Sequence, residues 1–322
     1  MKRSGLSIRS FFLQRMAEHT HNYGGQAVIE GVMIRGRKAV VTAVRRPAGE
    51  IAVEDRVLGS LYTGRWRRTP IVRGVIVLLE SMVLGIKSLL LSANVALEEE
   101  QEEEISGKAI FTMMASAVLL AVVLFFLAPL FLTDLVNRWI PNAVVFNLIE
   151  GAVRLAIFLA YLKIMGMIPD IKRVFSYHGA EHKTVNAYEA GVPMEVAEVQ
   201  KYGTAHVRCG TSFLFLVLVI AIFVFSLVGR PALWIMVISR VLLLPVIAAL
   251  GYEVIYLTAR HTGNWLVKIV QWPGLALQSM TTAEPDDEQI EVAIAAMKRA
   301  VEIDGGEMPG APPETVAPAE PA

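Results

Sequence analysis

Charge and cysteine are both scarce in this sequence. Only 19% of its 322 residues are charged, whereas 54% are hydrophobic and the mean hydropathy is +0.51. A chain with so few charges is too apolar for an ordinary soluble protein, so we expect a membrane protein with soluble parts. The single cysteine, Cys209, excludes a disulfide within the chain and gives no sign of an oxidising compartment.

The sequence also lacks several signatures that would assign a function directly. Its short apolar start is interrupted by Arg9 and Arg15, so residues 1–22 are interpreted as a flexible leader and not as a signal peptide. The glycines that punctuate residues 24–64 fit neither a Walker loop nor a dinucleotide fingerprint, so we assign no phosphate binding. We see no internal repeat and expect no nucleic acid as a partner.

Long apolar stretches fill the middle of the chain. A transmembrane helix needs about 20 predominantly apolar residues. Four stretches are long enough: 109–135, 143–168, 211–228 and 232–257. They form two pairs, 109–168 and 211–257, separated by the connection 169–210. We therefore expect an α-helical polytopic membrane protein with four transmembrane helices in contact with membrane lipid.

Positive charge indicates the orientation of these helices. The turns inside the two pairs are short and carry one arginine each, Arg138 and Arg230, whereas the leader and the connection 169–210 hold several lysines and arginines. By the positive-inside rule, the N-terminus, this connection and the C-terminus face the cytoplasm.

Two further segments precede the first pair. Residues 23–70 are predicted to form a small β-rich cytoplasmic domain, with strands at 39–44 and 51–53 joined through a turn at Pro47-Ala48-Gly49. Residues 71–104 are interpreted as an interfacial or re-entrant helix and an acidic linker, because charged side chains interrupt the apolar run at 71–97.

Residues 258–303 are expected to form cytoplasmic C-terminal helices. The segments 264–271 and 275–281 are expected to follow the membrane surface. An amphipathic helix then starts after Pro285 and packs on the soluble part. The apolar residues on its one face are Ile290, Ile294, Met297 and Val301. Residues 304–322 are rich in proline, alanine, glutamate and glycine, which is typical of a disordered tail.

The motif H-x-x-E-H, formed by His178, Glu181 and His182, carries the clearest chemistry. On a helix, residues three and four positions apart share one face, so both imidazoles and the carboxylate lie around a single point. Two histidines and a glutamate in this order are typical of a zinc enzyme. We predict His178 and His182 as ligands of a divalent metal, zinc by preference, and Glu181 as the general base.

A catalytic zinc site needs a further protein ligand, and the sequence offers three. Glu253 lies near the cytoplasmic end of the last apolar stretch, where the connection 169–210 also attaches, so it is the first candidate. His206 and Cys209 lie just before the third stretch, and zinc accepts both residue types. We place His206 ahead of Cys209, because a thiolate lowers the Lewis acidity that hydrolysis needs. The choice among the three stays open at this point.

Two arginines lie well inside apolar stretches, where an unpaired charge is costly. Arg154 is one helical turn from Glu150, so we predict a structural ion pair between them. Arg240 has no carboxylate nearby in the sequence, so we predict a contact with another helix or with a lipid head group.

Four sequence motifs resemble a known family. They are Gly24-Gly25-Gln26-Ala27-Val28-Ile29-Glu30-Gly31-Val32-Met33-Ile34-Arg35-Gly36, His178-Gly179-Ala180-Glu181-His182-Lys183, Arg208-Cys209-Gly210-Thr211-Ser212, and Pro273-Gly274-Leu275-Ala276-Leu277-Gln278 with Thr281-Thr282-Ala283-Glu284-Pro285. Together they resemble the YqhQ-like bacterial membrane family, a domain-of-unknown-function family of predicted metal-dependent enzymes. The resemblance implies a protein of the bacterial inner (plasma) membrane and supplies no established substrate.

Three classes of function are compatible with these features. The first is a membrane-bound metal-dependent hydrolase that acts on a cytoplasmic or membrane-proximal substrate. The second is a non-catalytic scaffold or assembly factor that holds a structural metal. The third is a transporter with the histidines at an ion entry site, but the apolar stretches contain few polar residues and no repeat.

Overall fold

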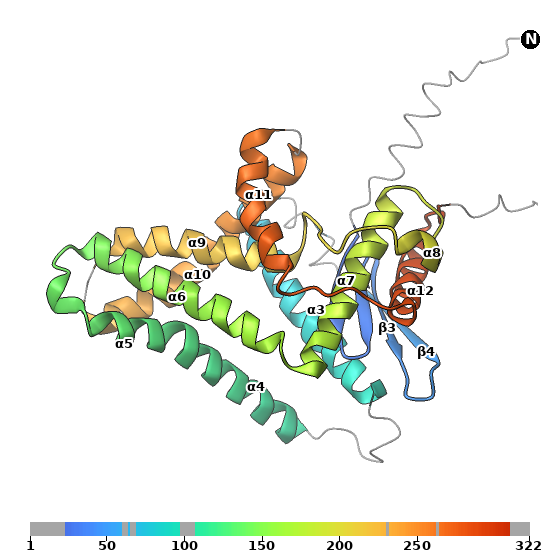
Figure 1. The fold of residues 1–322 in the computed structure, drawn as a ribbon, viewed down its shortest axis with the longest axis horizontal. Coiled ribbons are helices and arrows are strands. Elements are labelled where there is room, and N and C mark those ends of the chain that lie inside the picture. The colour runs from blue at the N-terminus through green and yellow to red at the C-terminus, as the bar shows by residue number, and fades with distance from the viewer. Residues whose placement is uncertain are drawn as a thin grey trace, which may run out of the picture.

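The structure is a computed structural model that describes residues 23–59, 64, 69–96, 107–229, 232–261 and 264–309. A small α/β unit adjoins a set of long apolar helices (Figure 1). The predicted leader, the acidic run 98–104 and residues 310–322 of the predicted tail lie outside the described residues.

A four-stranded antiparallel sheet, in the order β1-β2-β3-β4, forms the centre of the α/β unit. Its strands are β1 (Gly24–Val28), β2 (Gly31–Arg35), β3 (Ala39–Arg45) and β4 (Ile51–Val57). The predicted hairpin is confirmed as β3–β4. Its turn is closed by backbone hydrogen bonds from Arg46 N to the carbonyl of Glu50 and from Gly49 N to the carbonyl of Arg46. The N-terminal region also contains a second hairpin, β1–β2, which the sequence analysis did not predict.

Helices cover both faces of the sheet. Helices α7 (Pro169–Glu189) and α12 (Asp287–Asp304) pack on one face, and α3 (Val72–Ala96) packs on the other. The buried strand residues facing α7 and α12 include Val32, Ile34, Val41 and Ala43. Those facing α3 include Met33, Val40 and Val44. Successive residues of β2 and β3 therefore point to opposite faces of the sheet and join the hydrophobic core on each face, as the two-residue period of a strand requires.

Helix α12 joins the C-terminal part of the chain to the N-terminal sheet. It starts with a capping box between Asp286 and Gln289, at the predicted position. Its predicted apolar face is buried, and consists of Ile290, Ile294, Met297 and Val301. At its end the carboxylate of Asp304 accepts hydrogen bonds from the backbone N–H groups of Arg37 (2.7 Å) and Lys38 (2.9 Å).

Within the described residues, five helices are long and apolar enough to cross a membrane: Val72–Ala96, Gly107–Asp134, Ala143–Met165, Gly210–Val228 and Ile238–Thr258. Their length and composition indicate a membrane protein. The last four correspond to the four predicted stretches. The first is α3, a continuous helix of 25 residues. The candidates therefore number five and not four, and no re-entrant turn divides residues 72–96.

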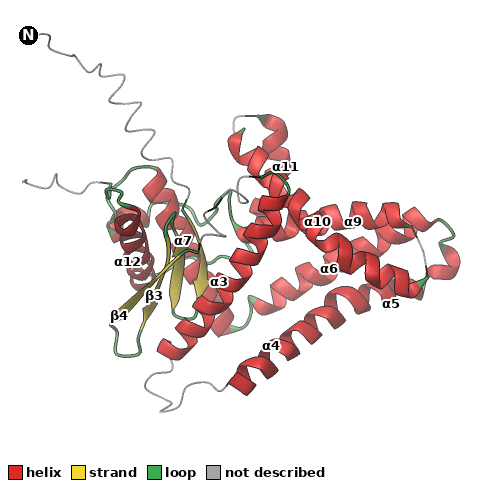
Figure 2. Cartoon of the chain, turned by 180° about the vertical axis from the view of Figure 1, so that it is seen from behind, coloured by secondary structure: helices red, strands yellow, loops and turns green. Residues whose placement is uncertain are grey.

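The remaining elements follow in chain order. Helix α4 (Gly107–Val122), a π-helical turn η2 (Val123–Leu127) and α5 (Ala128–Asp134) form the second candidate span, and a 3-10 turn η3 (Asn137–Trp139) leads to α6 (Ala143–Met165). After α7 come α8 (Val196–Val199), α9 (Gly210–Val228), α10 (Leu233–Arg260) and α11 (Trp265–Gln278). Helices α4, α5, α6, α9 and α10 extend away from the sheet in both views (Figures 1 and 2).

A buried cluster of charges links three of these segments. Glu150 of α6 pairs with Arg154 one turn away, as predicted (2.6 Å), and with Arg240 of α10 (2.6 and 2.8 Å). The predicted interhelical contact of Arg240 is therefore confirmed. The Nε of Arg154 donates to the carbonyl of Phe125 in the π-helical turn η2. This carbonyl supplies a polar partner in an apolar segment, where few are available.

Candidate metal centre

Helix α7 holds the H-x-x-E-H motif in the interior of the protein. It begins with Pro169 in its first turn, which suits a helix start, and ends near Gly191, whose φ of 73° suits a helix end. His182 is only 1% exposed and Glu181 only 3%. Close packing against α7 depends on Gly179, because a Cβ there would lie 2.1 Å from the backbone oxygen of Ala283. Glu181 and His182 are therefore enclosed by the chain, whereas His178 is half-buried.

Two backbone carbonyls orient the histidines. His178 Nδ1 lies 2.9 Å from the carbonyl oxygen of Thr281, and His182 Nδ1 lies 2.5 Å from that of Thr204. A carbonyl oxygen can only accept, so each Nδ1 carries the hydrogen and donates it. The Nε2 of each ring is then the nitrogen that is left to bind a metal ion. Metal-binding histidines in proteins are commonly oriented by such a second hydrogen bond.

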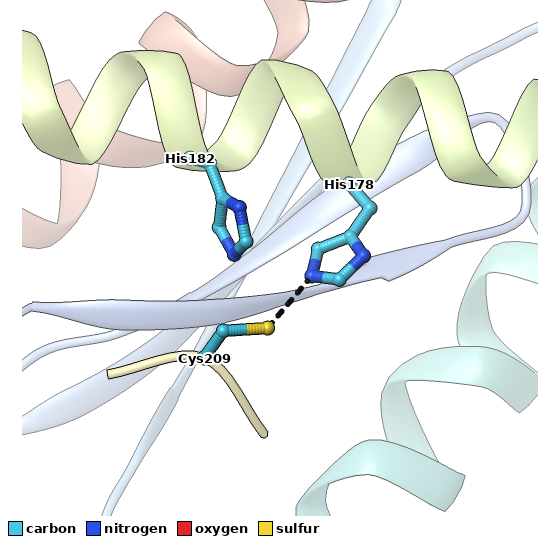
Figure 3. Close-up of side chains that lie close together, drawn as sticks. All are labelled: His178, His182 and Cys209. Atoms are coloured by element: carbon cyan, nitrogen blue, oxygen red, sulfur yellow. Dashed lines mark hydrogen bonds between the residues drawn. The ribbon is translucent and has the colours of Figure 1, made fainter. Parts of the chain in front are cut away.

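Cys209 lies opposite both rings. It is the N-cap residue of α9, and its Sγ is 3.3 Å from His178 Nε2 (Figure 3). The sulfur is also 3.1 Å from Thr211 Oγ1 and accepts the Thr211 N–H. One ligand atom from each of His178, His182 and Cys209 lies within 4.8 Å of the others. Two ring nitrogens and a sulfur thus point at one small volume and could hold one metal ion.

Glu181 lies beside this group of atoms. Its Oε2 is 3.4 Å from His182 Nε2. Burial raises the pKa of Glu181, and this rise is opposed in part by His178, His206 and the backbone N–H of Gly25. Strand β1 lies directly against the carboxylate, since a Cβ on Gly25 would be 2.8 Å from Glu181 Cγ. A buried carboxylate with a raised pKa, next to candidate ligands, is suited to exchanging a proton.

His206 lies next to the cluster of His178, His182 and Cys209 but outside it. Its ring centroid is 5.7 Å from that of His182, and its Nε2 is 3.8 Å from Glu189 Oε2. No hydrogen-bond partner for His206 Nε2 is found within the described part of the chain. Arg208 also pairs with Glu189. Burial raises the pKa of Glu189, but His206 and Arg208 outweigh this effect and hold it below its usual value.

Gln278 fixes the backbone at His206. Its Oε1 accepts the N–H of His206, and its Nε2 donates to the carbonyl of His206, both at 2.8 Å. The same Nε2 donates to Ser212 Oγ at 2.7 Å. The end of α11 therefore positions the segment that leads from His206 to Cys209.

Glu253, the first candidate for the third ligand, lies elsewhere. Both of its oxygens accept hydrogen bonds from the Arg73 guanidinium, and one also accepts the backbone N–H of Ile71 at 3.0 Å. This pair joins α10 to the start of α3 and leaves the carboxylate outside the cluster. Of the three candidates, Cys209 is the one placed against the histidines. This order differs from the sequence-based ranking, which placed Glu253 and His206 first.

Several residues of the site carry no chemical signal in the sequence. Thr204 and Thr281 contribute only their backbone oxygens, which any residue could supply. Gly25 contributes the absence of a side chain, and Gln278 acts through two backbone groups 72 residues away. Three of these four lie within the motifs that resemble a known family, and Thr204 lies in none of them.

Comparison with known proteins places the chain in a family. A family model described as a protein of unknown function (DUF1385) matches residues 69–303. This chain therefore belongs to that family of unknown function. The chain is also 36% identical over 297 residues to the uncharacterized protein YqhQ of Bacillus subtilis (strain 168), covering 88% of this chain and 93% of the relative. No solved structure matches.

Proposed function

We propose that this protein is a membrane-bound metal-dependent hydrolase, with a divalent metal held by His178, His182 and Cys209. The observation that carries the proposal is the pair of hydrogen bonds from the Nδ1 atoms to Thr281 and Thr204. A buried histidine of any kind needs an acceptor for its N–H, so these bonds support a metal site only together with the position of the other ring nitrogens. Two histidines that donate through Nδ1, each with a ring nitrogen within 4.8 Å of a cysteine sulfur, favour a metal site.

The donor set fits zinc. Zinc accepts imidazole nitrogen at about 2.0–2.1 Å and thiolate sulfur at about 2.3 Å, and its catalytic sites combine three protein ligands with one open position. The three ligand atoms, within 4.8 Å of one another, need only small side-chain adjustments to meet such an ion. A bound zinc would supply Lewis acidity and lower the pKa of a water molecule.

The chain's own residues would divide the remaining work. Glu181, next to His182 Nε2, would accept a proton from the attacking water and pass it to the leaving group. Thr281 and Thr204 would keep the imidazoles in the required tautomer. Strand β1 and the segment ending at Ala283 would limit the access of bulk water to the buried carboxylate.

The proposed location is the inner membrane of a bacterium, with the site and both termini on the cytoplasmic side. The support is the excess of lysine and arginine in the leader and in residues 169–210 compared with the short turns. The substrate would be reached from the cytoplasm or the membrane surface.

Metal analysis of the purified protein tests the proposal. We expect about one zinc or similar ion per chain, lost in His178→Ala, His182→Ala and Cys209→Ser. His261→Ala is the matched control, because this exposed histidine lies at the end of α10 and its ring Nδ1 bonds to the carbonyl of Leu257 in the same helix. Wild-type protein that binds no metal under reducing conditions would refute the metal site.

A second candidate function is a non-catalytic scaffold with a structural metal. The cysteine ligand and the burial of His182 and Cys209 favour it, since structural zinc sites are rich in cysteine and closed to solvent. Glu181→Gln separates the two candidates. Both predict that this variant keeps its metal, but only the hydrolase predicts that it fails to complement deletion of the gene.

A further inference from the structure

Helix α11 exposes more apolar surface than a protein surface in water normally carries. Between 47% and 70% of each of five large apolar residues is exposed: Trp265, Leu266, Ile269, Val270 and Trp272. Lys268 is the one charged residue in the helix. Contiguous apolar patches of this kind mark contact with a partner or a membrane.

Two features of α11 identify the partner as lipid. The helix has 14 residues and is therefore about 21 Å long, which is too short to cross a hydrocarbon core of about 30 Å. Its first eight residues begin and end with tryptophan, Trp265 and Trp272. Tryptophan is enriched at the boundary between the hydrocarbon and the head groups.

The placement of α11 agrees with that partner. Its C-terminal half packs on α9, where Gly274 lies close enough to Ser212 that a Cβ would be 2.9 Å from the serine side chain. Its N-terminal half extends away from α9, and the helix lies across α9 instead of along it (Figures 1 and 2). A helix transverse to membrane-spanning neighbours lies in the membrane plane.

We propose that α11 is an in-plane helix embedded in the interfacial layer of the bilayer, and that it thereby holds the His178–His182–Cys209 cluster at the membrane surface. Its apolar residues would enter the acyl-chain boundary, and Lys268 would reach the head groups.

The connection from α11 to the cluster is direct. Gln278, at the end of the helix, holds the backbone of His206, and Thr281, three residues later, accepts the hydrogen bond from His178 Nδ1. The depth of α11 therefore sets the depth of the cluster. If the proposed hydrolase function is correct, the substrate class that follows is a bond presented at the lipid–water boundary.

Tryptophan quenching by brominated lipids tests the position of α11. Two single-tryptophan variants, keeping Trp265 or Trp272 and replacing the other four tryptophans by phenylalanine, are placed in phosphatidylcholine–phosphatidylglycerol bilayers. We expect both to lose most emission with lipids brominated near the head group, and less with lipids brominated near the chain end.

Two controls calibrate the measurement. In each, all five native tryptophans are replaced by phenylalanine and one new tryptophan is introduced. Val57→Trp, on exposed strand β4, should keep its emission with every lipid. Phe111→Trp, on the exposed face of α4, should be quenched because that helix is a candidate span.

Three outcomes would overturn the proposal. The first is no quenching of Trp265 and Trp272 by lipid. The second is deep quenching of one with shallow quenching of the other, as expected for a helix that dips into the bilayer. The third is loss of quenching together with a dimeric mass, which would mean that a second copy covers α11. None of these outcomes depends on metal content, so they test α11 separately from the hydrolase.

Discussion

Replacing Glu150 by alanine would leave Arg154 and Arg240 buried side by side without the carboxylate that both contact. Glu150 is only 2% exposed, and its hydrogen bonds to the two guanidinium groups measure 2.6–2.8 Å. Each pair of opposite charges about 4 Å apart is worth about 4 kcal/mol at an effective dielectric constant of about 20. The desolvation of Glu150, which the substitution relieves, offsets part of this.

The net cost should resemble that of breaking other buried ion pairs, about 3–5 kcal/mol. At about 2 °C per kcal/mol for a large chain, this lowers the apparent melting temperature by roughly 6–10 °C. Thermal unfolding of the protein in nanodiscs, followed by circular dichroism, measures the shift. Glu150→Gln should cost less, because it keeps one acceptor oxygen and the shape of the side chain.

Two further variants make the argument refutable. Leu148→Ala, on the exposed side of the same helix, should change the melting temperature little. Replacing Glu150, Arg154 and Arg240 together by leucine should recover most of the stability lost in Glu150→Ala, because no uncompensated charge remains. Wild-type stability of Glu150→Ala would show that the cluster does not hold these helices together.

Two other substitutions probe how the α/β unit encloses the site. Gly25→Ala places a Cβ 2.4 Å from the oxygen of Met33 and 2.8 Å from Glu181 Cγ, so the melting temperature should fall, whereas Gly24→Ala, with nothing within 4 Å, should be silent. Asp304→Ala should cost about 2–4 kcal/mol in urea unfolding, because it leaves two backbone N–H groups without their acceptor, and the exposed Glu307→Ala should cost nothing measurable. The described contacts would be contradicted if Gly25→Ala were as stable as Gly24→Ala, or if Asp304→Ala were as stable as Glu307→Ala.

Local patterns in the sequence predict a large part of this fold. The apolar face of α12 and its Asp286 cap follow from helical spacing, and the β3–β4 hairpin follows from the Pro47-Ala48-Gly49 turn. The first hairpin is harder to predict, because Gly24, Gly25 and Gly31 resemble turn signals although they lie within β1 and β2.

The site shows where local patterns stop being informative. The spacing of His178 and His182 places both on one face of α7, and that is a property of the helix alone. The choice among Glu253, His206 and Cys209 depends on how α9 and α10 pack against α7, which no local pattern encodes. Arg73 binds Glu253, although the two residues are 180 positions apart in the chain.

The same limit applies to α3. Its composition alone allows an interfacial, re-entrant or membrane-spanning helix. Contacts with the sheet account for several of its polar residues, since Glu80 pairs with Arg35 and Ser88 bonds to Thr42. Glu80 and Ser88 are therefore polar because they contact the neighbouring strands. The sequence of the helix alone cannot show those contacts.

Zinc X-ray absorption spectroscopy of the metal-loaded protein tests the central claim most directly, because it reports the ligand atoms themselves. The account predicts one sulfur at about 2.3 Å together with nitrogen or oxygen donors at about 2.0–2.1 Å, and no such zinc signal from Cys209→Ser, which should lose the metal. A shell without sulfur in the wild-type protein, or no bound metal to measure, would contradict it.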